Sequence, residues 1–214
     1  MIQLKSLLVN FIMKNQTYNQ IIRDAQEKVK GLAKQNNWLW FYNLHQKEVI
    51  IYAEKLLKIY KRADSKIVII SCWLHDIAHY YATNSQEILE VKENHHIKGA
   101  EIAEKFLKKY KISKEEIDKI KNCIIRHRNK KPNTPKTLEE KIMVVADTMS
   151  HFGSIFYFTY FKFHPERTLE QMAEDDLAKL KRDWRDINIL PKARLMVEKE
   201  YRVIKKLFMN YNRS

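Results

Sequence analysis

Apolar residues recur at spacings of three and four along most of the chain, which is the period of an amphipathic helix. The clearest run is Val49, Ala53 and Leu56, which lie on one face of a helix predicted over residues 38–62. Residues 67–70 alone could form a strand, but no second run with alternating polarity offers that strand a partner. The pattern therefore predicts an all-α fold.

Capping residues mark the starts of the next helices. Asp64 or Ser65 can cap a third helix, and Ser113 with Glu116 can form a capping box for a helix over 114–128. The remaining helices are predicted over 3–33, from 65 to 75–79, 95–110, from 134 past 149, 152–163, 167–186 and 191–211.

Other boundaries depend on single residues or on a loss of period. Gly31 is expected to end the first helix. Pro135 suits the first turn of a helix that opens at Thr134. Residues 80–94 are polar and show no clear period, so we expect a loop there.

The predicted organisation is a single all-α domain with a helical extension at each end. Residues 1–37 form the N-terminal extension, 38–152 the core and 153–214 the C-terminal helices. The chain has only 3 glycines, and they are not clustered, which excludes glycine-rich phosphate-binding loops. Cys72 and Cys123 stand alone and are expected to be reduced residues within helices.

The chain shows no signal for a membrane. No apolar run is long enough to cross a bilayer, and the N-terminal stretch lacks a small-residue cleavage site. We therefore expect a cytoplasmic protein with no membrane partner.

The net charge of +14 could attract nucleic acid or an anionic substrate. The charge is spread over the whole chain without a basic tail, which favours a lysine-rich solvated surface and makes a nucleic-acid partner the weaker expectation. Arg126, Arg128 and Lys130 form a local exception around His127. This cluster could capture phosphate, or it could be a solvated helix end whose cations suit the helix dipole.

A set of histidines and aspartates stands out against the apolar helical faces. Each member lies inside or at the end of such a face: His45, His75, Asp76, His95, His127 and Asp147. A carboxylate desolvated in this way is costly unless a cation or hydrogen bonds satisfy it. Imidazole and carboxylate together suit one or two divalent transition-metal ions, with Mn, Fe, Co, Ni and Zn all open.

The order of these residues resembles the HD-domain superfamily of metal-dependent phosphohydrolases. His45 precedes the dipeptide His75-Asp76, and Asp147 follows an apolar run that contains alanine. A lone His-Asp dipeptide would be weak evidence, whereas several ordered motifs at compatible spacings are specific. The resemblance covers about residues 38–152.

Two further segments and two departures bear on the resemblance. The segment that begins at His95 and continues through Gly99 is similar to the family's His-x-x-x-Gly-Ala-x-x-Ala helix, and His127 is similar to its second accessory histidine. Ala78 replaces the glycine of the family's His-Asp-Ile-Gly, and His79 stands where some members have Lys or Arg. These departures leave the ligand positions intact but affect the expected contacts to substrate phosphate.

The resemblance implies a metal centre with named ligands. Its core ligands would be His45, His75, Asp76 and Asp147, with His75 and Asp76 in catalytic roles and Asp76 bridging two ions in binuclear members. His95 and His127 match the additional ligands of those members, or contact phosphate if one ion is bound. The implied activity is hydrolysis of a small phosphorylated metabolite or nucleotide by a metal-activated hydroxide, because a bound ion lowers the pKa of water toward ~7. Substrate contacts are expected from His79, Arg126, Arg128 and Lys130.

Other functions remain open on the sequence. The chain could be a catalytically silent metal-binding module with a regulatory or partner-binding role, a di-iron oxygenase related to binuclear members, or a basic nucleic-acid-binding protein. The aromatic stretch from Phe152 to Phe163 could be core, a nucleobase pocket or a homodimer interface. His96 is expected on a helix surface, and His151 and His164 have no partner in the sequence and are expected to be structural or exposed.

Overall fold

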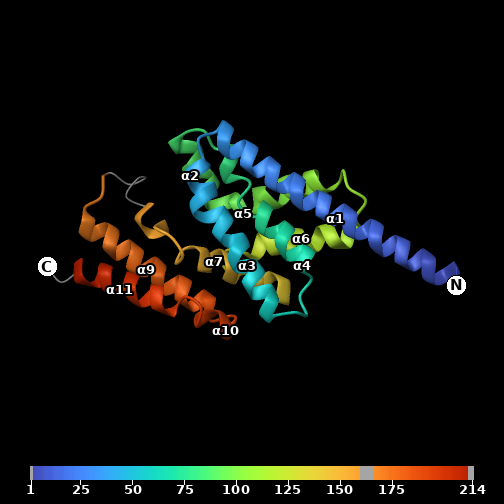
Figure 1. Cartoon of the computed structure of the whole chain (residues 1–214). Coiled ribbons are helices and arrows are strands. Elements are labelled where there is room, and N and C mark those ends of the chain that lie inside the picture. The colour runs from blue at the N-terminus through green and yellow to red at the C-terminus, as the bar shows by residue number, and fades with distance from the viewer. Residues whose placement is uncertain (1, 160–165, 212–214) are drawn as a thin grey trace.

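A computed structural model describes residues 2–159 and 166–211, which form helices joined by short connections (Figure 1). Within these ranges no strand occurs, and a single bridge joins Lys130 to Asn133. The longer helices are α1 (Ile2–Gln35), α3 (Lys47–Ile59), α4 (Ser65–Leu74), α5 (Ser85–Leu107), α6 (Lys114–Arg126), α7 (Leu138–Ser150), α9 (Leu169–Ile187) and α11 (Glu198–Tyr211). The short elements are α2 (Leu39–Phe41), the π-helical turn η1 (Tyr42–Gln46), the 3-10 helices η2 (His79–Tyr81) and η3 (Phe156–Thr159), and α10 (Pro191–Arg194). The predicted all-α fold class is confirmed.

Helix α4 lies in the middle of the fold because it is apolar on every side. Ile67, Val68, Ile70 and Leu74 are all buried although they point in different directions around the helix. One neighbour cannot cover such a surface, and α4 accordingly contacts α1, α3, α6 and α7. Full burial of each of these side chains contributes about 1.5–3 kcal/mol.

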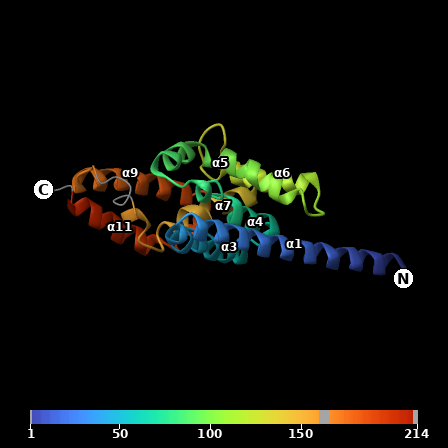
Figure 2. The same ribbon diagram turned by 90° about the horizontal axis from the view of Figure 1, so that it is seen from above.

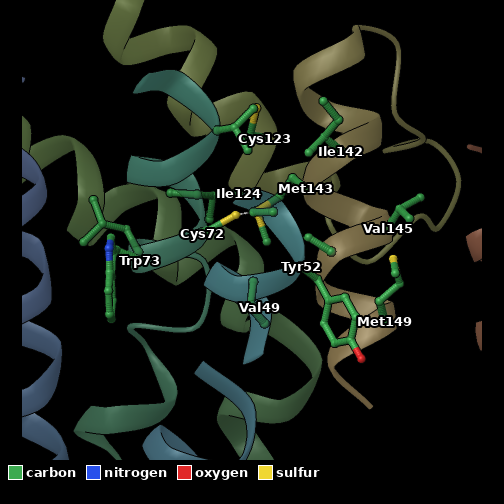
Figure 3. Close-up of a cluster of buried hydrophobic side chains, with 14 of the residues drawn as sticks. Val49, Tyr52, Cys72, Trp73, Cys123, Ile124, Ile142, Met143, Val145 and Met149 are labelled. Carbon is green, nitrogen blue, oxygen red and sulfur yellow. Dashed lines mark hydrogen bonds between the residues drawn. The ribbon is translucent and has the colours of Figure 1, made fainter. Parts of the chain in front are cut away.

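The core next to α4 is shown in Figure 3. Figure 3 draws Val49 and Tyr52 of α3 beside α7, whose Met143 points toward Cys72, in agreement with the close packing of α3 and α7. Cys72 donates a weak hydrogen bond to the sulfur of Met143 at 3.4 Å, and Cys123 lies nearby on α6. Both cysteines are buried and free, as the sequence analysis predicted.

The molecule is elongated, with the two ends of the chain at opposite ends of its long axis (Figures 1 and 2). Helix α1 runs along one side and extends past the other helices toward the N-terminus. At the other end, α9 and α11 pack against each other, and α9 also contacts α7. The C-terminal helices are therefore joined to the core through α7.

Two predicted capping sites are present in the structure. The Asp64 side chain accepts hydrogen bonds from the backbone N–H groups of Lys66 and Ile67 and so caps α4. Ser113 and Glu116 form the reciprocal capping box that starts α6. Among the described residues, no helix combines the length and the apolarity needed to cross a bilayer.

The first helix is present as predicted, but it ends a few residues beyond the boundary expected near Gly31. Helix α1 continues to Gln35 and ends where Asn37 adopts a φ of 61° and Trp38 N donates to Ala33 O at 2.8 Å. This left-handed turn is usually made by glycine, but asparagine also adopts it.

The predicted loop over 80–94 is wrong, because α5 begins inside it. Asn84 accepts a hydrogen bond from Glu87 N at 3.0 Å and caps the helix. Ile88 and Val91 then pack against the core from an otherwise polar surface. Asn84 as a cap and the apolar pair Ile88 and Val91 are visible in the sequence. The polar residues around them, however, leave no clear helical period of apolar positions.

The start of α7 differs from the prediction at Thr134 and Pro135. The helix begins three residues later, where Thr137 and Glu140 form a capping box. Thr137 Oγ1 accepts from Glu140 N at 3.3 Å, and the Glu140 carboxylate accepts from Thr137 N at 3.2 Å. Two satisfied helix-end donors outweigh the preference of proline for a first turn.

The C-terminal helices match the prediction only in part. Helix α9 lies close to the predicted 167–186, whereas the predicted helix over 191–211 is interrupted at 195–197 and forms α10 and α11. Of the predicted helix over 152–163, residues 152–155 form turns and bends and 156–159 form η3. The rest of that segment, with Tyr160, Phe161 and Phe163, lies outside the described residues.

Candidate metal centre

The histidines and aspartates singled out in the sequence come together from separate helices. The contributing elements are η1 with His45, the C-terminal end of α4 with His75 and Asp76, α5 with His95, the end of α6 with His127, and α7 with Asp147. All six side chains meet in one interior region at the junction of these helices, and five of them are buried. The π-helical turn at His45 inserts one residue into an otherwise continuous helical run from Leu39 to Ile59.

One half of the cluster contains His45, His75, Asp76 and Asp147. His45 Nε2 lies 3.3 Å from Asp76 Oδ2 and 3.2 Å from Asp147 Oδ1. His75 Nε2 lies 3.3 Å and 3.5 Å from the same two oxygens. The two Nε2 atoms are 3.3 Å apart. Two imidazole nitrogens and two carboxylate oxygens thus surround one point.

The other half lies across the Asp76 carboxylate. Asp76 Oδ1 is 3.5 Å from His95 Nε2 and 3.7 Å from His127 Nε2, and these two nitrogens are 3.1 Å apart. One oxygen of Asp76 therefore faces each half of the cluster, as a bridging carboxylate would.

Hydrogen bonds on the outer side of each ring set its tautomer. In His75, His95 and His127, Nδ1 lies 2.8, 2.9 and 2.6 Å from the backbone carbonyl three residues earlier. His45 Nδ1 lies 2.8 Å from the hydroxyl of Ser150, which itself donates to a carbonyl of α7 at 2.6 Å. Carbonyls only accept, and the Ser150 proton is already used, so Nδ1 carries the proton in each neutral ring.

The inner nitrogens consequently face one another as lone pairs. Such pairs 3.1 and 3.3 Å apart repel unless a cation or a proton lies between them. Asp76 Oδ1 is buried and has no hydrogen-bond partner. The donor set therefore fits divalent transition-metal ions, and the outer hydrogen bonds are those that orient ligating histidines.

The electrostatics of the first half show the same demand for positive charge. Burial opposes protonation of His75, but the carboxylates of Asp76 and Asp147 outweigh burial and raise its pKa to about 10. At His45, burial again opposes protonation, but Asp147 and Asp76 outweigh burial and raise the pKa of this ring as well. Despite their burial, Asp76 and Asp147 have pKa values well below the usual range because of these histidines.

The second half behaves in the opposite way. Burial lowers the pKa of His95 to about 4, and burial together with His95 lowers that of His127 to about 3. Both rings are therefore neutral near pH 7, which is the form that binds metal.

The predicted substrate-binding residues occupy different settings. His79 Nε2 is 3.9 Å from Asp76 Oδ1, and its ring stands 4.4 Å from that of His95. Arg126 donates to Thr134 O at 3.0 Å and lies 3.6 Å from Glu140. These contacts place His79 at the cluster and tie Arg126 to the turn before α7.

The rest of the basic cluster lies at the end of α6. Arg128 donates to the carbonyls of Lys92 and Glu93 at 3.1 and 2.7 Å, so it holds the turn of α5 that carries His95. Lys130 is exposed. Contact of these residues with a phosphorylated substrate stays a prediction.

His151 was not assigned a partner by the sequence, and the structure gives it one. It is buried, its Nδ1 lies 2.9 Å from Asp183 Oδ2, and its ring stacks on Phe156 at 4.0 Å. Asp183 comes from α9, far along the chain. His151 follows Asp147 by four residues, so both side chains lie on one helical face. This spacing could have suggested that His151 lies close to Asp147. His164 lies outside the described residues.

Gly99 allows α5 to cross close to the end of α4. A Cβ atom at this position would stand 2.9 Å from the backbone oxygen of His75. By contrast, a Cβ at Gly31 in α1 would have nothing within 4 Å. The close approach places His95, one turn earlier in α5, beside Asp76.

We expect Gly99→Ala and Gly31→Ala to change stability in opposite directions. At Gly99, overpacking against backbone costs about 1–3 kcal/mol, of which better helix propensity offsets up to about 1 kcal/mol. At the open Gly31 position, alanine should stabilise by about 0.5–1 kcal/mol. Thermal unfolding of both variants in a chelator measures the difference, and a Gly99→Ala variant as stable as Gly31→Ala would contradict the packing described.

Comparison with known protein families shows the family of the chain. The model of the HD domain family matches residues 44–150, and the chain belongs to this family. The matched range contains the six converging side chains and ends one residue before His151. Comparison with curated proteins and with solved structures gives no significant match.

Proposed function

We propose that the protein is a metal-dependent phosphohydrolase, a phosphomonoesterase or phosphodiesterase, that acts on a small phosphorylated metabolite or nucleotide. The observation that carries the proposal is the convergence of four imidazole Nε2 atoms on the carboxylates of Asp76 and Asp147, with the buried Asp76 Oδ1 left without a hydrogen-bond partner. Membership of the HD domain family supports it.

Each half of the cluster has its own part in the proposed chemistry. His45, His75 and Asp147 hold one cation position, and His95 and His127 the second, with Asp76 between them. A divalent ion bound there would supply Lewis-acid activation of water and of a phosphoryl oxygen. The outer hydrogen bonds keep the rings in place, so the cluster needs little reorganisation when charge develops on the phosphoryl group.

The substrate is proposed to approach along the more exposed side of the cluster. The side chains of His79 and Asp147 are each 15% exposed, whereas those of His45 and His75 are 2% and 0% exposed. A phosphoryl group at this rim would meet His79, whose imidazole can donate to a phosphate oxygen. The nearby cluster of Arg126, Arg128 and Lys130 would attract an anionic substrate.

A phosphate-release panel tests the proposal. Purified protein is assayed for phosphate release from nucleotides and sugar phosphates and for alcohol release from a phosphodiester, with added Mn²⁺, Co²⁺, Ni²⁺ or Mg²⁺, and its metal content is measured. We expect release that depends on a transition metal and stops with excess chelator. Retention of metal without turnover on the whole panel would favour a regulatory metal-binding module instead.

A further inference from the structure

We infer that His151, held by Asp183 of the C-terminal helices, is an additional ligand of the ion bound by His45 and Asp147. The inference rests on the proposed metal centre and extends it beyond the residues that match the family. It links α9 to the metal centre through His151, because Asp183 belongs to that helix.

The position of His151 supports this role. One ring nitrogen of His151, one of His45 and a carboxylate oxygen of Asp147 lie within 4.8 Å of one another. Ligand atoms on opposite sides of an ion, each about 2.1 Å from it, are about 4.2 Å apart. Inward movements of a few tenths of an ångström, on the order of a ligand's usual adjustment, would bring the three atoms into coordination distance.

The ring of His151 lies as close to His45 as the other converging rings lie to one another, but it is stacked on His45 at an interplanar angle of 19°, whereas those pairs are tilted. The ring centroids of His45 and His151 are 5.4 Å apart. The corresponding distances are 5.5 Å for His45 with His75 and 5.0 Å for His95 with His127. These two pairs are the ones whose Nε2 atoms face each other.

The hydrogen bonding of His151 also follows the pattern of those histidines. Its Nδ1 faces an acceptor on the outer side, Asp183 Oδ2 at 2.9 Å, and we place the ring proton on this nitrogen. This leaves Nε2 as the unprotonated nitrogen of the neutral ring. His96 lacks the pattern, since its Nδ1 is buried without a partner. A carboxylate that orients a histidine in this way is the usual support of a metal ligand.

Asp183 is itself fixed from several sides. Tyr157 donates to Asp183 Oδ2 at 2.8 Å, and the Lys179 ammonium donates to the same oxygen at 2.7 Å. Lys179 Nζ also lies 3.1 Å from His151 Nδ1, so the ammonium contacts both the carboxylate and the ring. Because this buried network holds the Nδ1 edge of the His151 ring, it also fixes the direction in which the Nε2 edge points.

The test measures metal affinity in the full-length protein, with Co²⁺ and Mn²⁺ as probes. His151→Phe retains the ring that stacks on Phe156 but removes both nitrogens. Asp183→Asn keeps the shape of the supporting side chain and removes its charge. Asp186→Asn is the matched control, because it changes a hydrogen-bonded carboxylate on the same helix that pairs with Asn129 and Arg185 instead. Circular dichroism verifies the fold of each variant.

We expect Asp183→Asn to raise the Kd for Co²⁺ by about 10- to 100-fold. His151→Phe should raise it at least as much and should change the Co²⁺ absorption spectrum, because a nitrogen ligand is lost. The Asp186→Asn control should bind as the wild type does. If the wild type binds no metal, the proposed function fails. If the wild type binds and His151→Phe has the same Kd and the same spectrum, the ligand role of His151 alone is overturned. Should His151→Phe fail to fold, an unchanged Kd in Asp183→Asn overturns it equally.

Discussion

Asp76→Asn should remove both bound metal and phosphate release. Asp76 is the residue that both halves of the cluster share, with Oδ2 3.3 Å from His45 and His75 and Oδ1 3.5 Å from His95. An amide keeps the size of the side chain but removes its negative charge and turns one oxygen into a donor. Because loss of a supporting residue outside the ligand set already costs about 10- to 100-fold, loss of the shared ligand should cost more than about 100-fold in activity.

Elemental analysis and the phosphate-release assay measure the two effects together. Asp118→Asn, which changes an exposed carboxylate on α6, serves as the control and should keep metal content and activity. The thermal unfolding of each metal-free variant shows whether it is folded. An Asp76→Asn protein that retains its metal and its hydrolysis would refute the proposed centre.

Addition of a transition metal should raise the thermal stability of the metal-free protein substantially. In the absence of an ion, the unprotonated Nε2 atoms of His95 and His127 face each other at 3.1 Å. An ion that binds the folded state alone stabilises it by about 4 kcal/mol at a concentration of 1,000 times its Kd. For a chain of this size, each kcal/mol corresponds to about 2–4 °C in Tm, so the shift should be about 8–16 °C.

The order of the ions provides a further check on the donor set. Imidazole-rich sites prefer Mn²⁺, Co²⁺, Ni²⁺ or Zn²⁺ over Mg²⁺, which favours oxygen ligands. Excess chelator should reverse the shift, and His75→Ala should abolish it. Equal shifts with Mg²⁺ and Co²⁺, or no shift with any ion, would be inconsistent with the centre described here.

Much of the fold follows from local patterns that act within a few residues. The apolar faces of α3 and α4 and the caps at Asp64 and Ser113 depend only on neighbouring residues, so they could be predicted. The differences from the prediction have local causes too. Asn37 took the helix-ending role expected of Gly31, and the cap at Asn84 was hidden in a polar stretch.

The candidate site was predictable where the residues are unusual for their surroundings. Asp147 follows an apolar run, and a carboxylate there needs a cation or hydrogen bonds. The resemblance to the HD family then placed His45, His75 and Asp76 with it. Ser150 and Asp183 could not be found in this way, because a serine at the end of a helix and an aspartate within the polar sequence of α9 carry no signal of their own.

Helical period and desolvated carboxylates are local properties, so the amino-acid sequence alone predicted the helices and a cluster of candidate metal ligands. The HD-type core was predicted from the resemblance of the ordered motifs to that family. The tertiary structure decided how the histidines group on either side of Asp76, which ring nitrogen faces inward, and that Asp183 of α9 contacts His151. These features depend on contacts between residues far apart in the chain. Such contacts form only when the helices pack, so no local pattern determines them.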